Sequence, residues 1–394
     1  MPAEAAATAQ PTEAEQFQTD RVLTISAGHA THDTYTAFLY PLLPVFIENL
    51  ALSKTEAGLL TVFMQGPSLV QPFIGHLADR VSLRYLVILA PAVTATMMSL
   101  LGVAPNYGLL ALLLVVTGVS SATLHAVAPV MAGRLSGRNL GRGMGFWMVG
   151  GELGRALGPI IIVTVIRFLG LESTPWLMVG GMLASVALYL RLRDVPGRPP
   201  NTGEGLPWRH ALRAMGPLLV PLVVIIVVRS FMSSVLTTYL PVFLTEEGTE
   251  LWFAGVSLSV LEAAGVVGAL LGGTLSDRLG RRTILFISLF ATPLLMFVFL
   301  AADGWIRFPL LLAMGLTALS VSPVIMALVQ ESFPENRALA NGVYMAVSFL
   351  LSSGVVVVVG AMGDFWGMHL TFAVSAAIPL LGLPFLLLLP PRQR

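Results

Sequence analysis

The chain has 394 residues, of which 56% are hydrophobic and only 11% are charged, and its mean hydropathy is +0.83. Soluble domains carry about 25% charged residues, so this chain has too few for a soluble globular enzyme, and its hydrophobicity excludes a disordered chain. The net charge of +1 gives no support for nucleic acid binding, and the lack of cysteine excludes disulfides, iron–sulfur clusters and thiolate metal sites. We therefore expect a polytopic helical membrane protein.

Apolar segments follow one another along the chain, each long enough for the roughly 20 residues that a spanning helix needs. The first 20 residues are rich in Ala, Glu, Gln and Thr and lack the basic start and apolar stretch of a signal peptide. We expect them to form a disordered tail. The twelve expected spans are 22–49, 57–77, 84–103, 107–133, 143–168, 174–191, 216–245, 251–275, 283–302, 307–330, 338–362 and 367–390.

The basic residues fall almost entirely on one side of these spans. If both termini share one side, only Lys54, Arg167 and Arg307 lie on the other side, and Arg155 and Arg229 fall inside spans. The remaining 17 of the 22 basic residues then lie on the side of the termini. Such asymmetry is typical of the cytoplasmic side, so we expect a multi-pass protein of the cytoplasmic (inner) membrane with both termini in the cytoplasm.

The two halves of the chain resemble each other. A Tyr-x-Pro-Val-Phe-like segment recurs with Pro44 and Pro241 at an offset of 197, and a Gly-x-Leu-x-Asp-Arg segment recurs with Asp79 and Asp277 at an offset of 198. Parallel six-helix repeats describe one known transporter architecture. We expect an all-α membrane protein of twelve helices in two pseudo-repeated halves. The expected parts are a disordered cytoplasmic tail (1–20), an N-terminal half (21–191), a cytoplasmic linker (192–215) and a C-terminal half (216–394).

The second repeated segment resembles the signature loop of the major facilitator superfamily, Gly-x-Leu-x-Asp-Arg-x-Gly-Arg-Arg. The copy at 273–282 is complete, whereas the copy at 75–84 has Ser82 and Leu83 where Gly and Arg are expected. An Asp accepts hydrogen bonds from helix N-termini and from Arg. The loops are therefore expected to form a cytoplasmic clasp that holds the two conformations of a rocking bundle apart. The alternative is an ordinary charged turn. The expected gating residues here are Gly75, Asp79, Arg80, Gly273, Asp277, Arg278, Gly280, Arg281 and Arg282.

The fifth span resembles the glycine-rich Gly-Pro motif of proton-coupled drug exporters. Gly150, Gly154 and Gly158 recur every four residues and favour close approach of another helix. Gly154, Gly158 and the following Pro159 are further expected gating residues. With the polar residues of spans 1 and 4, this segment resembles the fosmidomycin-resistance branch of the superfamily. The arginine usual on the fourth helix of many drug exporters is missing, and His125 lies in that region.

Ionisable residues inside a membrane are costly and indicate function. On span 1, five polar side chains fall within an arc of about 100°, and Asp33 lies roughly 18 Å from Arg21 along the helix. Asp33 is the first candidate for a proton carrier; the alternative is a static Asp–His pair. Glu262 has no obvious local partner and is the second candidate, with a neutral hydrogen-bonded acid as the alternative. The five residues of the stripe are His29, His32, Asp33, Thr36 and Tyr40.

Other intramembrane charges have two readings each. Glu152 and Arg155 are three residues apart and are expected to pair. Arg229 either pairs with an acid across the bundle or binds an anionic substrate, and His125 either extends a proton path or packs in the core. The expected proton-coupling residues are Asp33, Glu262, His29, His32, Glu152 and His125, and the expected substrate-binding residues are Arg229, Arg155, Tyr40, Thr36, Ser233 and Tyr239.

The energy source is expected to be an ion gradient or the gradient of the substrate itself, and the resemblance favours a proton gradient. The chain has no Walker-type nucleotide motif, since its only lysine is Lys54, and it lacks the HExxH motif of zinc hydrolases, so we expect no enzyme and no cofactor or metal. The resemblance implies a secondary active transporter, a proton-coupled antiporter that exports a small drug-like or anionic organic solute and confers antibiotic resistance. The alternative is proton-coupled uptake or lipid-type transport of an organic anion on the same fold. The expected partners are the small-molecule substrate, protons and the lipid bilayer, with the protein acting as a monomer.

Overall fold

The computed structural model describes residues 16–78, 84–137, 139–195, 208–332 and 337–389, and within them the chain is helical with no strand. The first half forms helices α1 to α8, interrupted by a 3₁₀ turn at Gly66–Val70. Their bounds are α1 (Thr19–Thr36), α2 (Leu39–Leu50), α3 (Lys54–Gln65), α4 (Gln71–Ala78), α5 (Arg84–Ser99), α6 (Tyr107–Leu135), α7 (Leu140–Leu169) and α8 (Met178–Leu192).

The second half forms helices α9 to α16, with a π-helical turn at Ser234–Thr238 and 3₁₀ turns after α16. Helix α9 begins at Trp208, eight residues before the expected span. Only the segment inside the membrane needs to be apolar, and the helix extends beyond that segment. The bounds are α9 (Trp208–Ser233), α10 (Leu240–Glu246), α11 (Leu251–Leu279), α12 (Arg281–Ala301), α13 (Arg307–Ala318), α14 (Val321–Ser332), α15 (Arg337–Trp366) and α16 (Met368–Ala377).

Ten helical stretches of the described chain are long and apolar enough to cross a membrane, and they correspond to the third to twelfth expected spans. The first two expected spans are broken into shorter helices, α1 with α2 and α3 with α4. Pro41 and Pro67 lie at these breaks, where each removes a backbone N–H that a continuous helix would use. The expected all-α membrane fold is confirmed, and the two broken spans make it consistent with twelve crossings.

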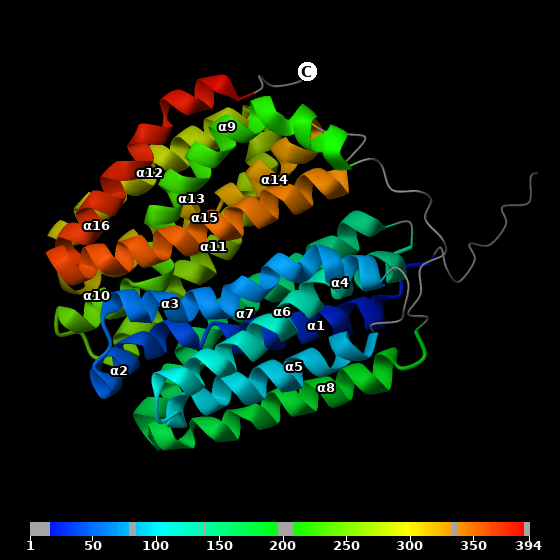
Figure 1. Ribbon diagram of the computed structural model, residues 1–394, viewed down its shortest axis with the longest axis horizontal. Coiled ribbons are helices and arrows are strands. Elements are labelled where there is room, and N and C mark those ends of the chain that lie inside the picture. The colour runs from blue at the N-terminus through cyan, green and yellow to red at the C-terminus, as the bar shows by residue number, and fades with distance from the viewer. Residues whose placement is uncertain (1–15, 79–83, 138, 196–207, 333–336, 390–394) are drawn as a thin grey trace, which may run out of the picture.

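The two halves lie one above the other in Figure 1, with α1–α8 below and α9–α16 above. They meet where α3 packs on α15 and α7 packs on α11. We call the end of the bundle that holds the start of α3 and the end of α10 the closed end, and the opposite end, where α1 and α9 begin, the terminal end.

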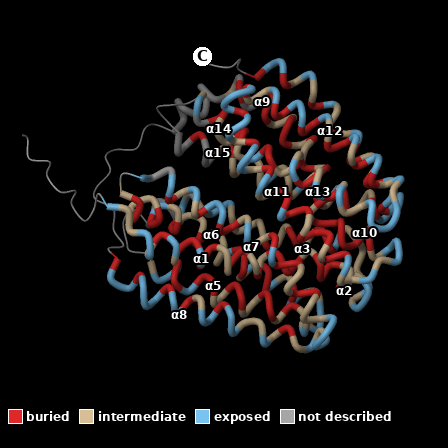
Figure 2. Tube along the Cα trace, turned by 180° about the vertical axis from the view of Figure 1, so that it is seen from behind, coloured by how far each residue is buried: buried red, intermediate tan, exposed pale blue. Residues whose placement is uncertain are grey.

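The hydrophobic core explains why the halves are joined at one end. One buried cluster contains side chains from both halves, among them Leu60 of α3 and Val356 of α15. The two other clusters each lie within a single half, around Ala128 in the first and Ile325 in the second. Figure 2 shows these buried residues as separate red tracts toward the terminal end. Apolar burial therefore holds the halves together chiefly at the closed end.

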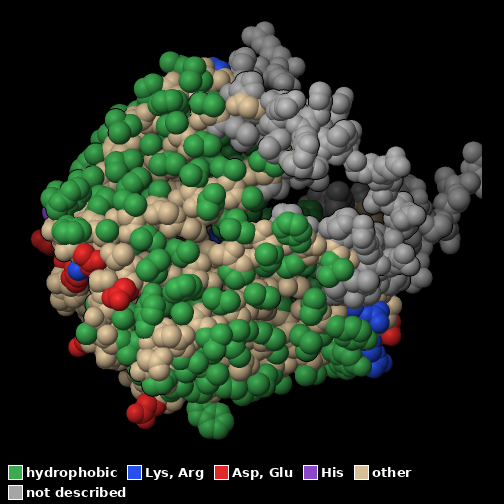
Figure 3. Space-filling view, in the orientation of Figure 1, with side chains coloured by type: hydrophobic (Ala, Val, Ile, Leu, Met, Phe, Trp, Pro, Cys, Tyr) green, Lys and Arg blue, Asp and Glu red, His purple; other side chains and the backbone are tan. Residues whose placement is uncertain are grey.

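The outer surface is apolar. Large side chains such as Phe73, Trp176 and Phe365 are 75%, 79% and 85% exposed, which is characteristic of a lipid-facing surface rather than a water-facing one. Figure 3 shows hydrophobic side chains over most of the visible face and charged side chains gathered at its two ends.

Two helices at the closed end begin at capping side chains. Ser53 Oγ accepts from the backbone N–H of Glu56 at 3.1 Å, and a Glu56 carboxylate oxygen accepts from the Ser53 N–H at 2.8 Å. Asn106 Oδ1 accepts from the Leu109 N–H at 2.9 Å at the start of α6. These caps satisfy N–H groups that have no partner inside the helix and so fix where α3 and α6 start.

Candidate functional site

A cluster of three histidines surrounds Asp33 inside the first half. The Asp33 carboxylate lies 3.3 Å from His29 Nε2, 4.0 Å from His32 Nε2 and 3.9 Å from His125 Nε2. Asp33 is only 6% exposed, and His125 comes from α6 whereas the other three come from α1. The structure thus brings together four of the six residues that the sequence singled out for proton coupling.

The ring of His29 is held from two sides. It stacks on the indole of Trp147 with ring centroids 3.6 Å apart, and its Nδ1 lies 2.9 Å from the Trp147 carbonyl oxygen. Gly151 of α7 lies against the same ring, where an added Cβ would come 2.7 Å from His29 Nε2. Sequence reasoning missed Trp147, whose role depends on how α7 packs against α1.

The glycine face of α7 packs against α1, as the spacing of the glycines predicted. An added Cβ at Gly154 would meet the backbone N of Thr34 at 2.9 Å, and one at Gly158 would meet Ala37 Cβ at 2.6 Å. Pro159 follows within α7 without ending the helix. This close approach is possible because glycine has no side chain, and it fixes the positions of Glu152 and Arg155 on the rest of α7.

Arg155 joins the two halves electrostatically. It forms an ion pair with Glu152 on its own helix, as expected, and its Nε lies 3.7 Å from the Glu262 carboxylate on α11. The sequence showed no local partner for Glu262, and in the structure its partner comes from the other half of the chain. Tyr40 lies close enough for the charges of Glu262 and Arg155 to act on its hydroxyl.

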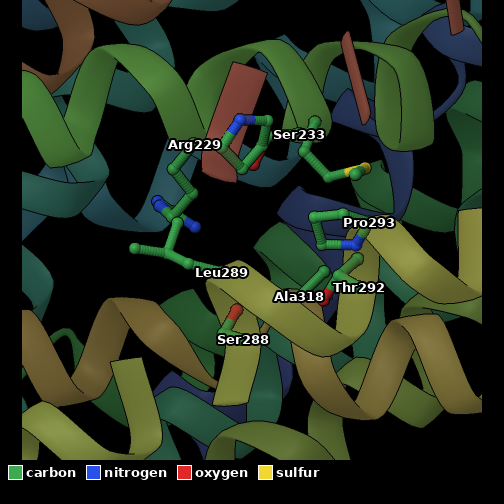
Figure 4. Close-up of a pocket in the computed structure, with 9 residues that line it drawn as sticks. Arg229, Ser233, Ser288, Leu289, Thr292, Pro293 and Ala318 are labelled. Atoms are coloured by element: carbon green, nitrogen blue, oxygen red, sulfur yellow. The ribbon is translucent and has the colours of Figure 1, made fainter. Parts of the chain in front are cut away.

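Arg229 lines a small pocket inside the second half. In Figure 4, Arg229 and Ser233 of α9 lie on one side of the pocket, and Ser288 and Thr292 of α12 lie on the other. Among the described residues Arg229 makes no ion pair; its Nη2 lies 3.4 Å from Ser322 Oγ, and its buried Nε has no hydrogen-bond partner. The remaining lining residues are Met232, Leu289, Pro293, Ala318 and Pro379.

The polar stripe predicted on span 1 does not continue as one helix. Thr36 ends α1 and its hydroxyl donates to the Asp33 carbonyl at 3.0 Å, whereas Tyr40 belongs to α2. Tyr239, also expected to bind substrate, is fully buried, and its hydroxyl lies 3.0 Å from the carbonyl oxygens of Lys54 and Val356. In this conformation Tyr239 therefore ties the two halves together.

Further polar contacts cross between the halves at the closed end. The Asp364 carboxylate accepts from the backbone N–H groups of Lys54 at 2.7 Å and Thr55 at 3.0 Å. Lys54 Nζ lies 2.8 Å from Glu246, and Arg167 lies 2.9 Å from Glu250. Sequence reasoning missed Asp364, because nothing local in the sequence relates it to a helix start 310 residues earlier.

The complete signature loop joins α11 to α12. Gly280 has φ of +94° at the turn, and Arg281 lies 2.6 Å from Asp277 and 2.7 Å from Glu331 of α14. Arg282 donates to the Leu387 carbonyl at 3.2 Å. Gly273 and the exposed Arg278 lie near the end of α11, and Gly75 lies in α4, while Asp79 and Arg80 fall outside the described residues.

A bundle of membrane helices in two halves, with charged side chains at its centre and a polar pocket, defines a membrane transporter. The model of the Major Facilitator Superfamily matches residues 25–355 and 266–394. The fosmidomycin resistance protein of Escherichia coli (strain K12) is 23% identical over 370 residues, covering 91% of this chain and 90% of that protein. The uncharacterized MFS-type transporter YfnC of Bacillus subtilis (strain 168) is 24% identical over 391 residues, covering 95% and 93%.

Solved structures share the fold. A bacterial homolog to the human lysosomal transporter Spinster, in an inward-facing conformation, superposes with a TM-score of 0.78 at 14% identity, covering 94% of this chain and 96% of that chain. A D-xylose-proton symporter superposes with a TM-score of 0.77 at 15% identity, covering 95% and 98%. The chain belongs to the Major Facilitator Superfamily, as the signature loop predicted, and this membership confirms that it is a transporter and not an enzyme.

Proposed function

We propose that this transporter couples the movement of protons to the export of a small drug-like or anionic organic solute, as an antiporter that works by alternating access. The observation that carries the proposal is the position of Arg155 between Glu152 in its own half and Glu262 in the other half. A charge network that crosses from one half to the other responds to protonation by changing how the halves attract each other.

The coupling step follows from the charges of this trio. Ionised Glu262 attracts Arg155 and favours contact between α7 and α11. A proton on Glu262 removes that attraction and leaves Arg155 with Glu152, so α7 and α11 are free to separate at this point. Protonation of one buried carboxyl thereby changes the relative stability of two arrangements of the halves, which is what a proton-driven transporter requires.

The Arg229 pocket supports an anionic solute. A half-buried guanidinium whose buried Nε has no partner among the described residues is costly in a membrane protein, and an anion in the pocket offsets that cost. The serine and threonine hydroxyls across the pocket supply further hydrogen-bond donors. A fosmidomycin resistance protein and the probable nitrate/nitrite transporter NarK2 of Mycobacterium tuberculosis (strain ATCC 25618 / H37Rv), which is 30% identical over 269 residues, are among the relatives of this chain and support a drug-like or anionic solute.

The proposed orientation places both termini on the cytoplasmic side of a bacterial inner membrane. The closed end then faces the exterior. The halves 21–191 and 216–394 are the two bodies that rock, joined by the linker 192–215, and the tail 1–20 and the signature loops lie on the cytoplasmic side. We further propose that the protein acts as a monomer.

A second candidate is proton-coupled uptake of an organic anion. The Arg229 pocket serves an imported anion as well as an exported one, and a D-xylose-proton symporter has the same fold. The two candidates differ in the direction in which protons move relative to the solute.

The test uses purified protein in proteoliposomes that contain a pH-sensitive dye. A thermal-stabilisation screen with fosmidomycin, nitrate and D-xylose first identifies the solute that binds. When that solute is added outside, antiport drives protons out and makes the lumen alkaline, whereas symport makes it acidic. Stabilisation by D-xylose alone, or solute entry without any pH change in the lumen, contradicts the proposal.

A further inference from the structure

Two histidine nitrogens face each other in the Asp33 cluster. His29 Nε2 lies 3.2 Å from His125 Nε2, while His29 Nδ1 lies 2.9 Å from the Trp147 carbonyl oxygen and His125 Nδ1 lies 2.9 Å from the Ser121 carbonyl oxygen. A carbonyl only accepts, so each ring carries its N–H at Nδ1. In the neutral rings both Nε2 atoms then present lone pairs to each other, and a positively charged atom between them is required to make this arrangement favourable.

The Asp33 carboxylate completes a set of three donor atoms. Its Oδ2 lies 3.3 Å from His29 Nε2 and its Oδ1 lies 3.9 Å from His125 Nε2, and one donor atom from each of the three residues lies within 4.8 Å of the other two. Around a tetrahedral Zn²⁺ with nitrogen and oxygen ligands at about 2.0–2.2 Å, neighbouring ligand atoms are about 3.3–3.6 Å apart. The two histidine nitrogens, 3.2 Å apart, are already close to this spacing, and one carboxylate oxygen has to move closer to both of them to complete the set.

The surroundings of the three donors are those of a metal site. The bonds from both Nδ1 atoms to backbone carbonyls hold the rings in the tautomer that leaves Nε2 for the metal, which is the usual supporting contact of ligating histidines. The stacked Trp147 fixes the plane of His29. The side chain of His125 is 32% exposed, which gives an ion a route to an otherwise buried group.

His32 provides the independent observation. It is 0% exposed, and its ring nitrogens make no hydrogen bond of normal geometry among the described residues, although the Ala90 backbone lies near enough to interact. A buried polar group that is poorly hydrogen-bonded carries a desolvation penalty. Its Nε2 lies 4.0 Å from the Asp33 carboxylate, so the ring has to move toward the three donors to serve as a fourth ligand.

The charges at the centre of the bundle also favour a cation. Arg155 acts electrostatically on both Asp33 and His125, and it opposes a cation there. Arg155 is itself paired with Glu152 and Glu262. When ionised, the three carboxylates of this group exceed its one guanidinium by two negative charges, which a divalent cation balances.

We propose that His29, Asp33 and His125, with His32 as the fourth ligand, bind one divalent transition-metal ion of the Zn²⁺ type. A set of imidazoles with one carboxylate favours such an ion over Mg²⁺ or Ca²⁺, which prefer oxygen ligands. The bound ion links α1 to α6 and occupies the nitrogen lone pairs that a proton would take. The sequence predicted no metal site. The lack of cysteine, however, excluded only sites with thiolate ligands, whereas the ligands proposed here are nitrogen and oxygen atoms. The site does not depend on the proposed proton coupling through Glu262.

The test is metal binding by the tag-free, full-length protein in detergent after removal of bound metal with a chelator. Zn²⁺ is titrated calorimetrically, and Co²⁺ is titrated by its visible absorption, which reports tetrahedral coordination. We expect one ion per chain. Asp33→Asn and His125→Gln are each expected to weaken Zn²⁺ affinity by more than the roughly 10- to 100-fold that loss of a supporting contact costs. His369→Gln is the matched control, because His369 is an exposed histidine at the start of α16.

Each outcome decides the proposal. If the wild-type protein binds no Zn²⁺, or if the binding is lost in His369→Gln, the cluster holds a proton only and the proposal is wrong. It is also wrong if Asp33→Asn or His125→Gln, folded as judged by thermal unfolding, keeps the wild-type affinity. The His125 variant removes the most exposed ligand and so tests the site with the least disturbance of the core. No gradient or transported solute enters this experiment, so its result is separate from that of the proton-flux assay.

Discussion

Arg155 and Glu262 form an ion pair across the two halves of the transporter, with Nε and the carboxylate oxygen 3.7 Å apart. Arg155 is held on α7, whose glycine face is fixed against α1, and Glu262 lies in the middle of α11. The pair therefore links helix α7 of the first half to helix α11 of the second half. Any change in its charge acts directly on the contact between the halves.

Enlarging Gly154 should destabilise the first half. In Gly154→Val, the new side chain collides with the backbone of α1 near Thr34, and overpacking of this kind costs about 1–3 kcal/mol. We expect a lower unfolding temperature in detergent. Gly145→Ala on the same helix is the control, since an added Cβ there meets nothing within 4 Å, and it should leave the temperature unchanged or raise it. Equal behaviour of the two variants would show that α1 and α7 are not in close contact.

Removing the Asp364 carboxylate should loosen the closed end. Asp364→Ala deletes the bonds to the N-terminus of α3 from the other half. One hydrogen bond to a charged group contributes about 1.5–3 kcal/mol, and 1.4 kcal/mol is a tenfold change in an equilibrium. We expect at least a tenfold rise in labelling of Ala57→Cys, a fully buried site in a chain with no other cysteine, by a membrane-impermeant maleimide.

The control for this labelling is Asp303→Ala, which removes an exposed carboxylate at the same end. An increase of equal size in Asp303→Ala, or no increase in Asp364→Ala, would mean that the contact with α3 does not hold the halves together.

Arg229 should set the affinity for an anionic solute. Arg229→Gln removes the positive charge from the pocket, and loss of one member of a buried charged pair costs about 2–5 kcal/mol. We expect the affinity for the anionic solute identified by the stabilisation screen, measured by calorimetry, to fall at least tenfold. Arg167→Gln also removes one positive charge, but at the closed end, where Arg167 pairs with Glu250, and it should bind the same solute as the wild type does. Unchanged affinity in Arg229→Gln would remove this pocket from the binding site.

Features that depend on the spacing within one helix could be predicted from the sequence. His29 and Asp33 meet because they are four residues apart, Glu152 and Arg155 pair because they are three apart, and the glycines at every fourth position of α7 form one face. In each case the regular geometry of the helix determines which side chains are neighbours.

Features that depend on packing between helices could not be predicted. The meeting of His125 with His29 and of Arg155 with Glu262 requires the positions of α6, α7 and α11, and several helices offer partners at the same depth. Pro41 marked the break after α1, but prolines are frequent inside membrane helices, so the sequence alone did not separate a break from a kink. Arg229 was left with two alternatives, and only the absence of an acid near it in the described structure favours an anion.

The central claim is that protonation of Glu262 weakens the contact between the two halves. The most direct measurement is solute-driven proton flux in proteoliposomes with Glu262→Gln, a neutral side chain of the same shape, beside the control Glu48→Gln, which alters an exposed acid near the end of α2. The account predicts that Glu262→Gln still binds the solute but loses proton flux, while Glu48→Gln keeps both. Proton flux at the wild-type rate in Glu262→Gln would contradict the account.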